Sequence, residues 1–199
     1  MITIKKQNNS LANPIPIALE AWGKYNYDAT VNAYISYDDI GFCVRFVTTE
    51  AEPTRVHTNH FDPVHEDSCV EFFANFDPLH SDRYINFEVN ANCAMNPAFR
   101  KGRYDSIPLK LSEIHSFDIK IDIEPERWTA TYRIPFDFIK SYYPHFDIKT
   151  CRYITGNLYK CGDETPVYHL LTCFPMPEDN DDFHNPSAFR KIAIETPCL

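Results

Sequence analysis

Apolar and polar residues alternate along much of the chain, a pattern that predicts short β-strands with one buried face. The clearest stretch runs from Phe117 to Ile123, where every second residue is Phe or Ile and the residues between them are Asp or Lys. After a Glu-Pro-Glu-Arg turn the alternation resumes at Trp128 and continues to Ile134. The two stretches predict a hairpin in which Trp128 and every second residue up to Ile134 face the core.

Further strands are expected throughout the chain, whereas the helical pattern is confined to one place. The other expected strands are residues 31–37, 42–48, 69–75, 84–91, 151–159, 168–174 and 189–195. Residues 136–143 predict one or two short helical turns that end before Pro144. So many short strands with so little helix predict an all-β fold, an antiparallel β-sandwich of the immunoglobulin or jelly-roll kind. The 199 residues fit a single domain, with residues 1–20 as an N-terminal arm that Trp22 helps to pack.

Composition and charge narrow the possible partners. The 15 Phe and 12 Tyr residues exclude intrinsic disorder, and the 5 Gly make a phosphate-binding glycine loop improbable. A net charge of −9 without any basic run argues against nucleic acid, and no apolar run is long enough to cross a membrane. Seven cysteines without a Cys-x-x-Cys spacing, and an N-terminus without an apolar signal core, predict a cytoplasmic protein.

One expected strand carries an unusual polar face. Tyr84, Asn86, Glu88 and Asn90 alternate with apolar residues and would point away from the core. Two amides, a carboxylate and a phenol can hydrogen-bond to hydroxyl groups, and the phenol ring adds a flat stacking surface. This face fits a saccharide site, and its alternative is a polar outer surface that binds no ligand.

A second carboxylate strengthens the carbohydrate interpretation. Glu71 would face the same side as Glu88 if the two strands share a sheet, and Asn157 and Tyr159 add another polar strand end. Two neighbouring carboxylates can bind vicinal hydroxyls, or can act as acid and base in glycoside hydrolysis. A small glycoside hydrolase therefore stays open beside a protein that only binds sugar.

Five motifs follow one another in a characteristic order. They are Asp62-Pro-Val-His-Glu-Asp-Ser-Cys-Val-Glu-Phe-Phe73, Tyr84-Ile-Asn-Phe-Glu-Val-Asn-Ala91, Trp128-Thr-Ala-Thr-Tyr-Arg-Ile-Pro-Phe136, Gly156-Asn-Leu-Tyr-Lys-Cys-Gly-Asp163 and Asp182-Phe-His-Asn-Pro186. Over residues 20–195 this order resembles the family 9-like carbohydrate-binding modules, DOMON-like sandwiches that are often appended to xylanases. The resemblance implies a β-sandwich whose concave face binds the end of a saccharide, such as xylan or a related polysaccharide, without catalysis or cofactor.

The resemblance also implies roles for individual residues. Glu71 matches the carboxylate that binds sugar hydroxyls, while Glu88 and Asn90 fall in the polar strand, with Glu88 where a basic residue is expected. Tryptophans that sandwich the sugar are expected at two positions, where this chain has His65 and Cys173. Tyr168 or Phe174 is the aromatic residue available to replace the second. A sandwich that has lost sugar binding and serves a structural or partner-binding role is a further alternative.

Metal and haem sites find weaker support in the sequence. His57, His60 and His65, interspersed with Asp62, Glu66 and Asp67, contain ligand types for a transition metal but follow no defined spacing. Asp179, Asp181 and Asp182 offer oxygen atoms for calcium, which stays unassigned because an EF-hand pattern is absent. Met95 with one of the histidines is the haem alternative, and nothing in the sequence brings them together. We therefore assign no metal and no cofactor.

Overall fold

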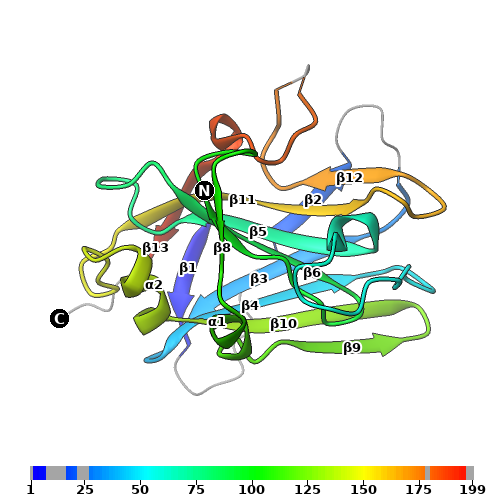
Figure 1. The fold of residues 1–199 in the computed structure, drawn as a ribbon, viewed down its shortest axis with the longest axis horizontal. Coiled ribbons are helices and arrows are strands. Elements are labelled where there is room, and N and C mark those ends of the chain that lie inside the picture. Colours follow the sequence, from blue (N-terminus) through cyan, green and yellow to red (C-terminus); the bar gives the residue numbers. More distant parts are fainter. Residues whose placement is uncertain (1, 8–16, 22–26, 178–179, 196–199) are drawn as a thin grey trace.

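Two β-sheets form the body of the protein in the computed structural model, which describes residues 2–7, 17–21, 27–177 and 180–195 (Figure 1). The first sheet contains, in spatial order, β8 (Ser106–Pro108), β7 (Ala98–Arg100), β6 (Tyr84–Asn90), β5 (Cys69–Asn75), β11 (Tyr153–Gly162) and β12 (His169–Thr172). The second contains β2 (Ile17–Ala21), β3 (Val31–Tyr37), β4 (Gly41–Thr48), β10 (Arg127–Pro135) and β9 (Lys120–Glu124). The predicted β-sandwich is confirmed.

The two sheets are joined at their edges. Strand β12 pairs with β2, which makes the hydrogen-bonded ladder continuous from one sheet to the other. Strand β1 (Thr3–Lys6) lies parallel to both β13 (Arg190–Ile194) and β3, and β13 pairs with β11. The sandwich is therefore antiparallel except where β1 closes one side.

The main core lies between the sheets and follows the alternation of the sequence. Phe87 of β6 stacks on Tyr132 of β10 at 6.0 Å between ring centroids, so the two sheets face each other. Trp128, Ala130, Tyr132 and Ile134 are all buried, as predicted for this hairpin strand. Its partner β9 begins only at Lys120 and lies at the sheet edge. Ile123 is consequently 39% exposed instead of buried.

A second, smaller apolar cluster covers the opposite face of the first sheet. It joins Cys69 and Phe73 of β5, Tyr84 of β6, and Tyr159 and Cys161 of β11 to side chains of the surrounding loops: Val64, Ala94, Met176, Phe183 and Ala188. These loops include the short helical turns η1 (Val64–Glu66) and η2 (Pro186–Ala188). Loops therefore cover the polar face predicted for β6, which is not open to solvent.

The structure also contains elements that the sequence pattern does not indicate. Helix α2 (Phe136–Tyr142) matches the expected helical turns, whereas α1 (Leu111–His115) and strands β1, β2, β7 and β8 were not predicted. Parts of the expected N-terminal arm are thus strands of the sandwich, while Trp22 lies outside the described residues. Within the described ranges, no helix is long and apolar enough to span a membrane.

Candidate functional site

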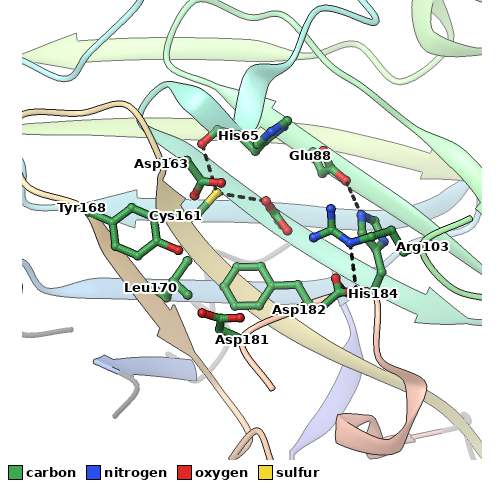
Figure 2. A pocket seen from close by; sticks show the side chains of 12 residues that line it. His65, Glu88, Arg103, Cys161, Asp163, Tyr168, Leu170, Asp181, Asp182 and His184 are labelled. Atoms are coloured by element: carbon green, nitrogen blue, oxygen red, sulfur yellow. Dashed lines mark hydrogen bonds and ion pairs between the residues drawn. The ribbon is translucent and has the colours of Figure 1, made fainter. Parts of the chain in front are cut away.

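A pocket opens on the loop-covered face of the first sheet, with a volume of about 180 Å³ (Figure 2). Strands β5, β6 and β11 supply its floor, and the turn η1, strand β12 and the loops after β7, β11 and β12 supply its walls. The lining residues are His65, Glu71, Glu88, Arg103, Cys161, Asp163, Tyr168, Leu170, Asp181, Asp182, Phe183 and His184. The pocket therefore combines hydrogen-bonding groups with several aromatic rings.

Strand register places two carboxyl groups side by side on the floor. Glu71 pairs directly with Glu88 across β5 and β6, and both residues are almost fully buried. The Cys161 thiol donates a hydrogen bond to Glu71 Oε1 at 3.1 Å. Glu71 Oε2 is buried and has no hydrogen-bond partner among the described residues. One oxygen on the pocket floor thus remains available to a ligand.

The wall facing β6 is built by ion pairing and aromatic contacts. Arg103 Nε donates to Asp182 Oδ2 at 2.9 Å, and Asp182 Oδ1 accepts from the backbone N–H of His184. Phe183 stacks on Tyr159 at 4.0 Å between centroids. These contacts attach the loop before β13 to the floor of the pocket.

Burial controls the protonation of the two carboxyl groups. Loss of solvent raises the pKa of Glu71 well above its ordinary value, and Cys161 and Glu88 add to this effect. Burial likewise raises the pKa of Glu88 to about 7, although Arg100 and the amide of Asn86 oppose the shift. The raised pKa values favour the protonated form of both carboxyl groups, and a protonated carboxyl can both donate and accept hydrogen bonds.

His184 lies between Glu88 and the aromatic residues of the pocket base. Burial, helped by Arg100, lowers the pKa of His184 to about 3. Its ring is therefore neutral at pH 7, and its Nε2 contact with Glu88 Oε1 at 3.7 Å is not an ion pair. The opposite nitrogen, Nδ1, lies 3.0 Å from the hydroxyl of Tyr84.

The sequence of the chain matches a known protein family. The sequence profile of carbohydrate-binding family 9 matches residues 5–194, almost the whole chain. The chain belongs to carbohydrate-binding family 9. Among the curated proteins no match was found.

Solved structures show the same fold as this family 9 module. A putative carbohydrate-binding protein from Bacteroides uniformis ATCC 8492 is 21% identical, with a TM-score of 0.79 and 98% of each chain covered. A family 9 module from Caldicellulosiruptor kristjanssonii in complex with glucose is 11% identical, with a TM-score of 0.66 and coverage of 99% of this chain and 96% of that one. Its complex with cellotriose gives 13% identity, a TM-score of 0.67 and coverage of 99% and 94%.

Three of the eight residues predicted for the sugar site line the pocket of the family 9 module. These are His65, Glu71 and Glu88. The other five do not line it and are buried, with no more than 1% of their surface exposed: Tyr84, Asn86, Asn90, Asn157 and Tyr159. Their side chains hold the surrounding loops rather than lining the cavity.

The three asparagines show how the loops are fastened. The Asn90 amide donates to His57 O and to Asp67 Oδ2, each at 2.8 Å. Asn86 donates to Glu88 Oε1 at 2.7 Å and accepts from Arg100. Asn157 bonds to Thr172, and to Phe174 and Ala188 through their backbones. Amides that resemble ligand-binding groups in the sequence are here partners of backbone groups.

The two positions expected to hold stacking tryptophans differ in their placement. His65 lies in the pocket wall, whereas Cys173 packs against the main core and does not line the pocket. Of its two candidate replacements, Tyr168 lines the pocket and Phe174 packs against the main core. His65 and Tyr168 are therefore the rings available at these two places.

Sequence reasoning missed most of the pocket wall. Arg103, Asp163, Phe183 and His184 were not proposed as site residues, and Asp181 and Asp182 were considered only for calcium. The motif Asp182-Phe-His-Asn-Pro186 carried a usable signal because it is one of the five motifs of the resemblance. Asp182 is paired with Arg103, and Asp179 lies outside the described residues.

In the histidine-rich segment before β5, the side chains considered as metal ligands form hydrogen bonds with other groups of the protein. His57 Nε2 lies 2.8 Å from Glu66 Oε2, and His60 Nδ1 accepts from the backbone N–H of Met95. Asp67 accepts from the backbone N–H groups of Val56 and His57. Met95 is fully buried in the main core.

Proposed function

We propose that this pocket binds the end of a saccharide and does not catalyse a reaction. The observation that carries the proposal is the pairing of the Glu71–Glu88 floor with the rings of His65, Tyr168 and Phe183 in one cavity. Carboxyl groups bind the hydroxyls of a sugar, and aromatic rings cover its C–H faces.

The size of the pocket suits a single terminal sugar unit. Its volume of about 180 Å³ equals that of several water molecules, since each occupies about 30 Å³ in the liquid. A sugar unit would displace this water and replace its hydrogen bonds with bonds to Glu71, Glu88 and Asp163. The remaining units of a chain would extend past Tyr168, which is 41% exposed.

Neutral glucans and xylans are the ligands to test first. Two similar structures are complexes of a family 9 module with glucose and with cellotriose. The resemblance to modules of xylanases adds xylan. Five acidic residues line the pocket against one arginine, which is paired with Asp182, so a strongly anionic sugar would be repelled.

Titration calorimetry against glucose, xylose, cello-oligosaccharides and xylo-oligosaccharides tests the proposal. We expect binding in the millimolar to micromolar range, because a small polar site buries little apolar surface. Glu71→Ala should abolish the binding, while Glu126→Ala, which changes an exposed turn residue, should leave it intact. No heat with any sugar of the panel would overturn the proposal.

An assay with chromogenic glycosides distinguishes sugar binding from glycoside hydrolysis. A glycoside hydrolase also uses a pair of carboxyl groups, of which the general acid has a raised pKa, and the pKa values of Glu71 and Glu88 are both raised. The hydrolase alternative predicts turnover of chromogenic glycosides that is lost in Glu71→Gln. Binding without turnover would support the non-catalytic module, and neither binding nor turnover would favour a structural role.

A further inference from the structure

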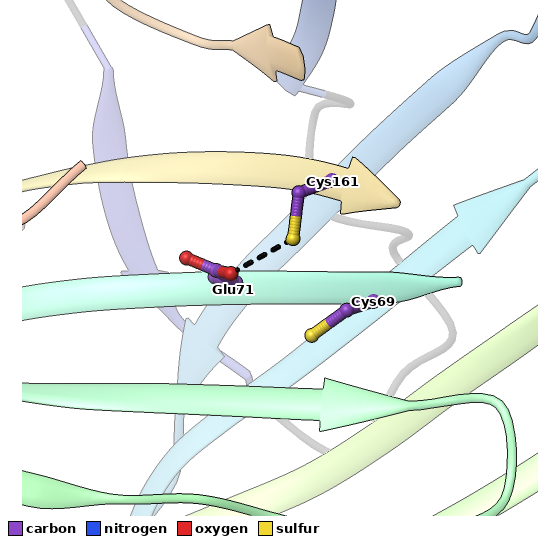
Figure 3. Close-up of side chains that lie close together, drawn as sticks. All are labelled: Cys69, Glu71 and Cys161. Atoms are coloured by element: carbon purple, nitrogen blue, oxygen red, sulfur yellow. Dashed lines mark hydrogen bonds between the residues drawn. The ribbon is translucent and has the colours of Figure 1, made fainter. Parts of the chain in front are cut away.

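A group of potential metal ligands lies at the base of the pocket. Cys69, Glu71 and Cys161 are fully or almost fully buried, and one ligand atom from each lies within 4.8 Å of the other two (Figure 3). Among the described residues no other group of three His, Cys, Asp or Glu side chains meets this condition. The sequence gives no hint of it, because the two cysteines are 92 positions apart.

The β-sheet itself creates this arrangement. Cys161 of β11 is paired directly with Cys69 of β5, and Glu71 lies two residues farther along β5. Residues two apart on a strand point to the same face, so all three side chains project toward the pocket side of the sheet. Rigid strands on both sides hold the three ligand atoms, which favours a defined coordination geometry.

The existing contacts leave a ligand atom available. The Cys161 thiol donates a hydrogen bond to Glu71 Oε1, while the second carboxyl oxygen of Glu71 is buried without a hydrogen-bond partner in the described part of the chain. Both cysteines are free thiols. A buried carboxyl oxygen without a partner is costly, and a bound cation would satisfy it.

We propose that Cys69 Sγ, Cys161 Sγ and a Glu71 carboxyl oxygen bind a thiophilic divalent metal ion of the zinc class. Two sulfur ligands select zinc, cadmium or cobalt over calcium and magnesium, which prefer oxygen. Ligands of a tetrahedral zinc lie roughly 3.8 Å apart when the Zn–S bonds are about 2.3 Å, so small rotations of these side chains suffice. On binding, the two thiols and the protonated Glu71 carboxyl release their protons to solvent, and the resulting two thiolates and carboxylate neutralise the divalent ion and leave one net negative charge.

The fourth coordination position faces the pocket. Glu71 and Cys161 line the cavity, whereas Cys69 lies in the apolar cluster beneath. A site with three protein ligands and one open position holds water or a ligand oxygen. The proposal does not depend on sugar binding, although both would use Glu71.

Titration of the reduced, metal-free full-length protein with Co²⁺ tests the site. We expect one Co²⁺ per chain, with the near-ultraviolet charge-transfer band of cobalt–thiolate bonds and the visible bands of a tetrahedral ion, and its displacement by Zn²⁺. Cys69→Ser and Cys161→Ser should each remove the charge-transfer band or weaken Zn²⁺ binding at least about 100-fold, since outer-shell changes already cost 10–100-fold. Cys93→Ser and Cys151→Ser, which alter thiols outside the cluster, should bind as the wild type does.

Two further measurements keep the test decisive if a cysteine variant does not fold. Glu71→Gln preserves the size of the side chain and an acceptor for Cys161, and should weaken Zn²⁺ without unfolding the protein. X-ray absorption of the zinc-loaded wild type should show two sulfur and two oxygen neighbours. No thiolate band, a metal bound by oxygen and nitrogen only, or equal binding by the Cys69 and Cys93 variants would overturn the metal site and leave the sugar proposal standing.

Discussion

Two buried polar clusters flank strand β11, and they are built on opposite principles. On one face of the strand, Lys160 lies between the sheets beside Glu50, with Tyr27, Trp128 and His169 around them. We call this group the edge cluster. On the other face, the pocket floor carries Glu71, Glu88 and Cys161. Neighbouring residues of one strand thus belong to very different environments.

The edge cluster contains both signs of charge, and its carboxylate is fully hydrogen-bonded. Glu50 accepts from Tyr27, Trp128 and Ser68 at 2.6–2.8 Å and lies 3.5 Å from the Lys160 ammonium. Burial alone would raise the pKa of Glu50, but Lys160 and these donors lower it below its ordinary value. The pocket floor holds only acidic groups, so burial raises their pKa values instead.

The hydrogen-bond partners of the two clusters distinguish a structural polar cluster from a binding site in this fold. Around Glu50, both carboxylate oxygens have hydrogen-bond donors inside the protein, so the cluster fixes the packing. Where acidic groups gather and Glu71 Oε2 has no partner among the described residues, as on the pocket floor, we propose that a ligand supplies the partner.

Glu50→Gln should produce the largest loss of stability. It leaves the buried Lys160 without a counter-charge, which costs about 3–5 kcal/mol in comparable buried pairs. Urea unfolding at pH 7 measures the loss, with Glu126→Gln as an exposed control. Because the pKa of Glu50 is lowered in the folded state, its contribution should be present above about pH 4.5 and disappear as the pH falls below that value. A loss below about 1 kcal/mol would contradict the structural role of the edge cluster.

Glu88 should affect the pH dependence of stability in the opposite direction to Glu50, and Glu88→Gln should remove this effect. A carboxyl group with a raised pKa favours the protonated folded state, so wild-type stability should fall as the pH rises from about 4.5 to 7. The fall is on the order of 3 kcal/mol, at 1.36 kcal/mol per pKa unit. Unfolding curves across this range should be flatter for Glu88→Gln. Equal slopes for wild type and variant would show that Glu88 is not buried as described.

Asn90→Ala should lower the stability of the protein and leave its sugar affinity unchanged. The side chain of Asn90 joins the loop at His57 and Asp67 to β6 and does not line the pocket. Its removal leaves buried groups unpaired, at about 1–3 kcal/mol. Thermal unfolding and calorimetry on the same protein separate the two effects. Loss of sugar affinity without loss of stability would return Asn90 to the binding site.

Tyr168→Ala should have the smallest effect, a modest loss of sugar affinity. The loss of one stacking ring costs about 1 kcal/mol, or roughly fivefold in affinity. Tyr104→Ala is the matched control, because Tyr104 is 95% exposed and does not line the pocket. His65→Ala should resemble Tyr168→Ala. Equal affinity for all three variants and the wild type would remove these rings from the sugar site.

Much of the fold could be predicted because strand alternation is a local property. The expected bounds of β3 and β5 are those of the structure, and the register of β10 was correct from Trp128 to Ile134. The short strands β7 and β8 were not predicted, because three residues are too few to show an alternation of apolar and polar side chains. Strand β11 begins at Tyr153 and runs to Gly162, later than expected, because its end is fixed by pairing with β12.

The sequence by itself determined which side chains turn away from the main core, since that depends only on the alternation within each strand. It could not show which of those side chains reach the pocket, because that depends on where distant loops fold over the sheet. Asn86 and Glu88 have the same phase on β6, yet Asn86 lies beneath the loops and Glu88 in the cavity. Likewise, only the pairing of β5 with β11 brings Cys161 to Cys69 and Glu71. Contacts between segments far apart in sequence decided the site, and tertiary packing alone creates them.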